Sequence, residues 1–127
     1  MIRSKWVPGL LALALLLCSP ALFGADSPVL RVVVVQTDNA DGYVKEIEKG
    51  KAIMKRLETS GVTRVWRAKF AGPNAGSVVV SLEFPNMAAF AKDDAKIAAD
   101  GEYQAWLKGL DKFRKVVSDS LYSELKP

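Results

Sequence analysis

Histidine is absent from this chain of 127 residues, and its one cysteine, Cys18, lies in an apolar N-terminal segment. Beyond that segment no disulfide can form, and the zinc sites built from cysteine and histidine are excluded. A histidine general base, a Ser-His-Asp triad and a proximal histidine haem ligand are excluded for the same reason. Any catalysis would depend on carboxylates, lysine, tyrosine or a bound cofactor. We expect no metal site and no resident cofactor.

A strong excess of charge of one sign is also lacking. The chain has 18 basic and 14 acidic residues, but two of the basic ones, Arg3 and Lys5, lie in the first 25 residues, where there is no acid. The other 102 residues hold 16 basic and 14 acidic side chains, a net charge of +2. This is not the charge of a nucleic-acid-binding protein, and we expect no nucleic-acid partner.

Residues 1–25 have the order of regions that is typical of a secretory signal peptide. A short basic start is followed by the apolar run 10–18, then by Pro20 and small residues. The run is shorter than the roughly 20 apolar residues that span a bilayer. We therefore expect an exported protein, periplasmic or secreted, with no stable membrane span after cleavage. Cleavage after Ala21 fits the small-residue rule better than cleavage after Ala25, and an uncleaved anchor is the alternative.

Residues 26–127 are expected to form one domain, in which four strands and three helices can be recognised. Four consecutive valines, 32–35, predict a central strand that is buried on both faces. Apolar side chains at spacings of four and three residues predict the first helix, which Gly61 would end in a left-handed conformation. The expected order is strand 29–37, helix 42–60, strands 62–70 and 77–84, helices 87–99 and 101–110, and strand 116–125, for which a helix remains the alternative.

This order of elements predicts the ferredoxin-like α+β fold, an antiparallel sheet of four strands with the helices on one face. The other face would carry apolar side chains, either Val33 and Val35 or Trp66 and Phe70. Exposed apolar surface of that extent favours a partner, and a second copy of the same sheet is the simplest one. We therefore expect a homodimer that forms through the uncovered face.

The chain resembles the dimeric α/β-barrel superfamily, in which two ferredoxin-like sheets face each other. The resemblance rests on the hairpin GVTRVWRAKFAGPNAGSVVVSLEFPNMAAF and on the stretch AADGEYQAW, and it covers residues 29–125. The NIPSNAP-like and antibiotic-biosynthesis-monooxygenase-like branches are the most similar. The monooxygenase and haem-degrading branches commonly use a histidine, which this chain does not have.

Four side chains are candidates for binding a ligand: Tyr43, Arg64, Trp66 and Arg67. An arginine can pair with a carboxylate, and Trp66 can stack on an aromatic group. The alternative is that Trp66 packs in the core or in the dimer interface. Because neighbouring residues of a strand point to opposite faces, Arg64 and Arg67 cannot both line one cavity on a regular strand.

Other residues that could carry chemistry have simpler interpretations. Glu83 is expected to form a cross-strand ion pair with a basic residue of strand 62–70. Asp93 and Asp94 are adjacent on a helix and point apart, so we expect a solvated face rather than a metal site. Trp106 has the helical spacing of a core residue.

Two functional hypotheses follow. In the first, the protein is an exported homodimer that binds a small apolar or aromatic ligand, or serves as an assembly module, without catalysis. In the second, it is a cofactor-independent oxygenase or isomerase that acts on an activated aromatic or enolic substrate inside the barrel. No catalytic residue can be named from the sequence.

Overall fold

The computed structural model describes residues 27–126. The predicted signal peptide and its cleavage points lie outside the described residues. The remainder folds into strand β1 (Val29–Gln36), helix α2 (Ala40–Arg56), strand β2 (Val62–Arg67), a short 3₁₀ helix η3 (Gly72–Asn74), strand β3 (Val78–Phe84), helices α3 (Met87–Ala99) and α4 (Gly101–Leu110), and strand β4 (Lys115–Ser123). The predicted order of elements and the ferredoxin-like α+β fold are confirmed, and the last segment is a strand.

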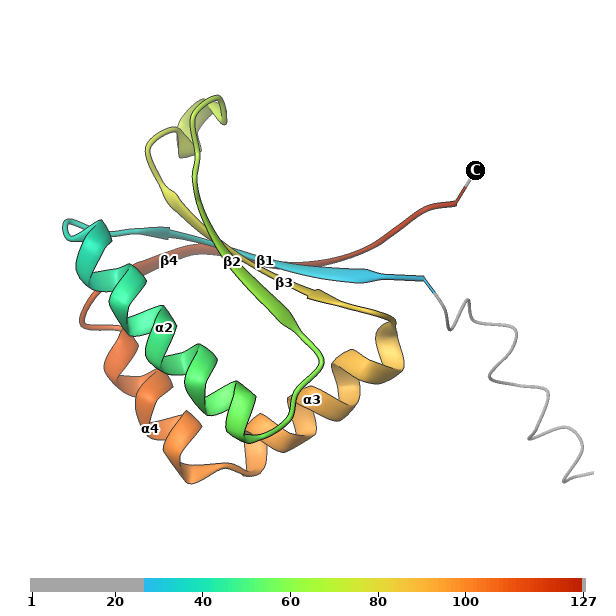
Figure 1. The fold of residues 1–127 in the computed structure, drawn as a ribbon. Coiled ribbons are helices and arrows are strands. Elements are labelled where there is room, and N and C mark those ends of the chain that lie inside the picture. The colour runs from blue at the N-terminus through green and yellow to red at the C-terminus, as the bar shows by residue number, and fades with distance from the viewer. Residues whose placement is uncertain (1–26, 127) are drawn as a thin grey trace, which may run out of the picture.

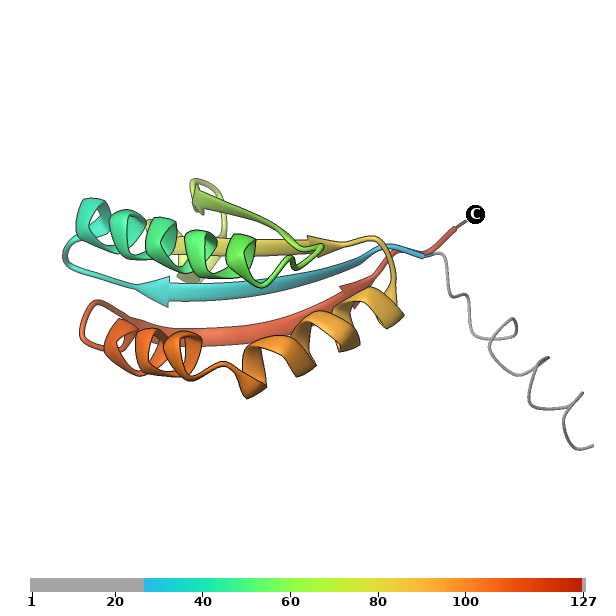
Figure 2. The same cartoon turned by 60° about the horizontal axis from the view of Figure 1, so that its bottom comes forward.

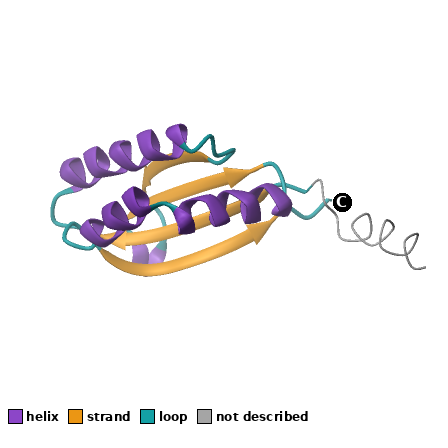
Figure 3. Ribbon diagram, turned by 90° about the horizontal axis from the view of Figure 1, so that it is seen from below, coloured by secondary structure: helices purple, strands orange, loops and turns teal. Residues whose placement is uncertain are grey.

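The four strands form one antiparallel sheet in the order β2-β3-β1-β4 (Figure 1). Helices α2, α3 and α4 cover one face of it, as Figures 2 and 3 show from two directions. No helix lies against the opposite face in the part of the chain that the structure describes. We call this second surface the open face. The prediction that the helices lie on one side is confirmed.

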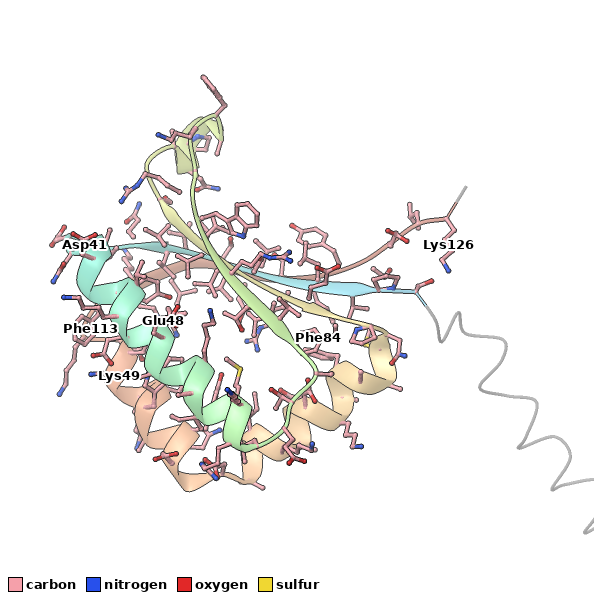
Figure 4. All side chains as sticks on the ribbon, viewed as in Figure 1. Asp41, Glu48, Lys49, Phe84, Phe113 and Lys126 are labelled. Atoms are coloured by element: carbon pink, nitrogen blue, oxygen red, sulfur yellow. The ribbon has the colours of Figure 1, made fainter. Side chains whose placement is uncertain are left out.

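Strand β1 occupies the centre of the sheet, between β3 and β4. Its residues Val33, Val34 and Val35 are all buried, as expected for a central strand. Val33 lies opposite Val80, and Val35 lies opposite Val78. Because paired residues of antiparallel strands share a face, these four valines form one layer beneath the helices. Side chains of the sheet and of the helices meet between the two layers (Figure 4), and these valines belong to that core.

Helices α2 and α4 pack closely because α2 has a glycine at their contact. A Cβ atom on Gly50 would lie 2.3 Å from the indole ring of Trp106. The indole Nε1 of Trp106 also donates a hydrogen bond to the Glu46 carbonyl at 2.9 Å. At the ends of these helices, Arg56 binds Asp100 at 2.8 Å. Trp106 is thus partly buried and packs against the core, as its spacing predicted.

The helix starts agree with the capping residues of the sequence. Asn39 accepts a hydrogen bond from the Gly42 amide, Asn86 from the Ala89 amide, and Asp100 from the Tyr103 amide. Each side chain satisfies an amide that the first helical turn leaves without a partner. These caps fix where the helix layer begins after β1, after β3 and at the break between α3 and α4.

Two predicted boundaries are wrong by three or more residues. Helix α2 ends at Arg56, and the left-handed residue after it is Glu58, with φ of 56°, rather than Gly61. A Cβ atom on Gly61 would lie 2.7 Å from the Phe84 ring, so this glycine is required by close packing. Strand β2 ends at Arg67, and Phe70 lies fully exposed in the hairpin loop. Since Phe70 has left the strand, it does not share a sheet face with Trp66.

None of the helices within residues 27–126 has both the length and the apolar character needed to cross a membrane.

Candidate functional site

The structure does not bring the four predicted ligand-binding residues together. Arg64 and Trp66 lie on the open face, since they pair with Ser81 and Val79. Arg67 is opposite Val78, which belongs to the helix-covered face, and its guanidinium donates to the Gly76 carbonyl at 3.2 Å. Tyr43 lies on α2, and its side chain is completely buried. The prediction that Arg64 and Arg67 face opposite ways is confirmed.

A shallow groove crosses the open face, and Arg64 and Trp66 line it. The indole Nε1 of Trp66 donates a hydrogen bond to the Ser81 hydroxyl at 2.7 Å, although the Trp66 side chain remains 53% exposed. Arg64 forms the expected cross-strand ion pair with Glu83, at 3.5 Å. The other residues that line the groove are Pro28, Val29, Leu30, Val32, Val79, Ser81, Tyr122, Ser123 and Glu124. Its floor is therefore largely apolar, with one ion pair at the β2 side.

A second space lies between the sheet and the helices, and we call it the interior cavity. Its volume is about 230 Å³. Apolar side chains from both layers make most of its wall, among them Val33, Ile47, Met54, Val80, Leu82, Ile97, Trp106, Leu107 and Leu110. The valine run of β1 and the apolar stripes of the helices thus line a space that they do not fill and that is partly open to solvent.

The polar residues of this cavity centre on Arg31 and Asp119. Arg31 donates two hydrogen bonds to the Asp119 carboxylate, from Nε at 2.9 Å and from Nη2 at 2.7 Å. The pairing of β1 with β4 places Asp119 opposite Val33, so it lies diagonally next to Arg31 on the helix-covered face. The Arg31 guanidinium thus lies beside the apolar core, and the Asp119 carboxylate neutralises its charge.

Arg114 is the second guanidinium in the cavity wall. Its Nη1 donates to the Tyr43 hydroxyl at 3.2 Å. Its Nε is buried and has no hydrogen-bond partner within residues 27–126. The nearest carboxylate oxygen, Oδ1 of Asp111, is 3.6 Å away, at ion-pair but not hydrogen-bond distance. Nε of Arg114 therefore has no accessible surface and no acceptor, while Nη2 forms no hydrogen bond within the described residues.

The titration of these groups follows from their contacts. The hydrogen bonds from Arg31 hold the pKa of the Asp119 carboxyl below its usual value, and Asp119 in turn raises the pKa of Arg31. Burial raises the pKa of Tyr103, against the opposing influence of Arg31 and Arg114. At neutral pH Asp119 is consequently a carboxylate, and the Tyr103 hydroxyl keeps its proton.

Our interpretation of the sequence considered Tyr103 as a possible pocket-lining hydroxyl but did not single out Arg31, Arg114 or Asp119. One signal was present, since Arg31 is the only charged residue within the apolar strand VLRVVVVQ. A charge at a central, helix-covered strand position needs a buried partner, and this requirement points to a polar site.

The prediction that Asp93 lies on a solvated face is wrong. Asp93 is 5% exposed. Its Oδ2 accepts hydrogen bonds from the Ser60 amide and hydroxyl, both at 2.9 Å, and from the Gly61 amide at 3.0 Å. It ties α3 to the turn before β2, while Asp94 is exposed at the cavity wall. The described residues contain no group of three acidic side chains that could hold a metal ion.

Comparisons with known proteins show the fold. No family model and no curated protein sequence matches this chain. A NIPSNAP family protein from Agrobacterium tumefaciens is 16% identical with a TM-score of 0.60, over 80% of this chain and 85% of the other. SnoaB, a cofactor-independent oxygenase from Streptomyces nogalater, is 14% identical with a TM-score of 0.58, over 80% and 96%.

A proposed antibiotic biosynthesis monooxygenase from Caulobacter crescentus is 13% identical with a TM-score of 0.59, over 80% of this chain and 93% of the other. The structural resemblance to both the NIPSNAP-like and the monooxygenase-like branches is confirmed. This chain thus has the ferredoxin-like α+β fold that NIPSNAP family proteins and antibiotic-biosynthesis-monooxygenase-like proteins share.

Proposed function

We propose that this protein is an exported homodimer that binds a small, largely apolar or aromatic molecule in the interior cavity. The observation that carries the proposal is the cavity itself, a space of about 230 Å³ between the sheet and the helices with a mainly apolar wall. Pockets for drug-sized ligands measure roughly 300 to 1,000 Å³. A ligand with one or two rings fits the smaller space.

The chemistry of the cavity supports binding rather than proton-transfer catalysis. A general base works best when its pKa lies near the working pH. The pKa of Asp119 is lowered, away from neutral pH, because two hydrogen bonds from Arg31 stabilise its ionised form. Tyr103 is shifted toward the protonated form by burial. Neither group is prepared to abstract a proton, so we favour the binding protein over the oxygenase or isomerase.

The open face supports the dimer part of the proposal. Four large apolar side chains of that face are 37 to 56% exposed: Leu30, Val62, Trp66 and Tyr122. They lie on β1, β2 and β4, so the apolar surface extends across the sheet. Monomeric proteins rarely leave such a surface uncovered. A second copy related by a two-fold axis would bury it and would close the groove that Arg64 and Trp66 line.

The export part of the proposal rests on residues 1–25 alone. Expression of the full chain in a bacterium with fractionation tests it. A mature protein in the periplasm or medium, shortened at Ala21 or Ala25, agrees with the proposal. A full-length protein that stays in the cytoplasm contradicts it.

A cavity-filling variant tests the binding site. Ala98 lines the interior cavity from an exposed position of α3, whereas Ala95, which is also exposed on that helix, does not line it. Indole, a neutral molecule with two fused rings, is titrated into the full-length gene product, and binding is followed by NMR chemical shifts. We expect shifts for residues of the cavity wall, loss of binding in Ala98→Phe, and retention in Ala95→Phe. Failure of indole to perturb the cavity wall would contradict the proposal, as would equal binding by both variants.

A further inference from the structure

We infer that the ligand of the interior cavity carries a carboxylate, and that Arg114 is the residue that recognises it. The inference deepens the proposed function and rests on it, because it assumes that the interior cavity is the binding site. It assigns a chemical class to the ligand, a small aromatic or cyclic acid, and a role to a side chain whose burial is otherwise unexplained.

The first argument is the position of Arg114. Its side chain is 11% exposed, it follows α4 directly before β4, and it forms part of the cavity wall. A buried guanidinium is stable only when its donors meet acceptors, since a charge without hydrogen bonds is costly to remove from water. Here Nη1 donates a hydrogen bond to the Tyr43 hydroxyl, while Nε has no acceptor among the described residues. Because Nε has no accessible surface, a ligand would meet the third nitrogen, Nη2, which forms no hydrogen bond among the described residues.

The second argument is that the neighbouring carboxylates leave this donor free. Asp119 is already bound by two hydrogen bonds to Arg31. Asp111 lies 3.6 Å from Nε, and its side chain is 73% exposed, so water screens its charge. Asp94, on α3, lines the cavity from an exposed position. Neither of the two carboxylates that line the cavity, Asp94 and Asp119, forms a hydrogen bond with Arg114 among the described residues.

The third argument concerns the form of the ligand. A guanidinium offers a planar fork of N–H donors that matches the two oxygens of a carboxylate. Tyr103 adds a hydroxyl to the wall, and burial keeps it protonated and able to donate. The remaining wall is apolar, with Trp106, Leu107 and Leu110 from α4 among its residues. A flat apolar body with one acidic group meets both kinds of surface.

Benzoate and its neutral counterpart benzamide test this, because the two probes have nearly the same shape. Each is titrated by NMR into the full-length gene product and into variants Arg114→Gln and Asp111→Asn. We expect wild-type protein to bind benzoate about tenfold tighter than benzamide, in line with the strength of a hydrogen bond to a charged group. Arg114→Gln removes that preference and leaves benzamide affinity unchanged.

Asp111→Asn keeps the inference testable if Arg114→Gln does not fold. It releases Arg114 from its nearest carboxylate, so benzoate affinity rises about two- to fivefold while benzamide affinity stays the same. Glu48→Gln, an equal charge change at an exposed position of α2, is the control for a general effect of charge. A structural role for Arg114 alone would not make benzoate affinity depend on Asp111.

Four outcomes overturn the inference. Equal affinity for benzoate and benzamide in wild-type protein does so while indole binding still upholds the proposed function. A benzoate preference that persists in Arg114→Gln, or an unchanged preference in Asp111→Asn, shows that another group recognises the carboxylate. If neither benzoate nor indole perturbs the cavity wall, the inference and the proposed function fail together.

Discussion

Arg31 and Asp119 lie on adjacent strands and join through two hydrogen bonds, Nε to Oδ1 at 2.9 Å and Nη2 to Oδ2 at 2.7 Å. They are 88 residues apart in the sequence. The pair holds β4 to the centre of the sheet from the helix-covered side and forms one wall of the interior cavity. It therefore contributes both to the stability of the fold and to the shape of the site.

Asp119→Asn is expected to lower the free energy of unfolding by about 0.5 to 1 kcal/mol, because the amide loses the charge that the Arg31 guanidinium meets. The value is kept small because the Asp119 side chain is 41% exposed and water screens the pair. Urea denaturation followed by circular dichroism measures it. A variant as stable as wild type would show that the pair adds nothing to stability.

The contribution of Asp119 to stability should depend on pH. Its pKa is lowered in the folded protein, so the stabilisation is present above the unfolded value of about 3.9 and is lost as pH falls through the folded value. The stability difference between wild type and Asp119→Asn should be constant from about pH 5 upward and should shrink toward about pH 2. Urea titrations at several pH values measure this, and a difference that does not change with pH contradicts it.

Gly50→Ala is expected to destabilise the protein by about 1 to 3 kcal/mol, although alanine is the better helix former. The new Cβ would lie 2.3 Å from the Trp106 ring, and one of the two helices would have to shift. Gly109→Ala, where nothing lies within 4 Å of an added Cβ, is the control and should be neutral or stabilising by up to about 1 kcal/mol. Thermal unfolding of both variants compares them, and similar melting temperatures would contradict the packing argument.

Two adjacent aspartates should respond differently to the same change. Asp93→Ala leaves the Ser60 and Gly61 amides without their acceptor, and we expect a loss of about 2 to 3 kcal/mol. Asp94→Ala, at an exposed position without such bonds, should change stability by less than about 0.5 kcal/mol. Chemical denaturation of the two variants side by side measures the contrast. Equal losses would mean that the Asp93 contacts are not the cause.

Trp66→Arg is expected to turn the proposed dimer into a monomer, because it replaces a large apolar side chain of the open-face groove with a charge. Phe70→Arg is the matched control, since Phe70 is an equally large apolar residue that is exposed in the hairpin loop and not on the sheet. Size-exclusion chromatography with light scattering gives the mass of each protein. A wild-type protein that elutes as a stable monomer would contradict the dimer.

The fold followed from local patterns, and the site did not. Four consecutive valines and the alternation around Trp66 predicted a central strand and two faces of a hairpin, and both are observed. These features depend on residues that are close in sequence. The Arg31–Asp119 pair depends on the register of β1 with β4, which shifts between Val34 and Val35. No local pattern could reveal that register.

The helical spacing around Asp93 indicates that its side chain is buried. It lies three residues after Phe90 and four before Ile97, so it shares their face, which packs on the sheet. Phe90 meets Phe84 with ring centroids 5.1 Å apart. A carboxylate on the apolar side of a helix requires buried donors. This rule indicates an anchor rather than a solvated charge, and the Ser60–Gly61 turn supplies the donors.

The contact between Gly50 and Trp106 joins helices α2 and α4 into one unit of the helix layer, and helix α3 is the other unit. Helices α2 and α4 pack closely because Gly50 has no Cβ, and the indole of Trp106 donates a hydrogen bond to the Glu46 carbonyl. Helix α3 is held by the carboxylate of Asp93, by Lys96 Nζ, which donates to the Glu58 carbonyl at 3.0 Å, and by one edge-to-face aromatic pair. We therefore expect amide hydrogens of α3 to exchange with solvent sooner than those of α2. A molecule that enters the interior cavity is expected to displace α3 rather than α2 or α4.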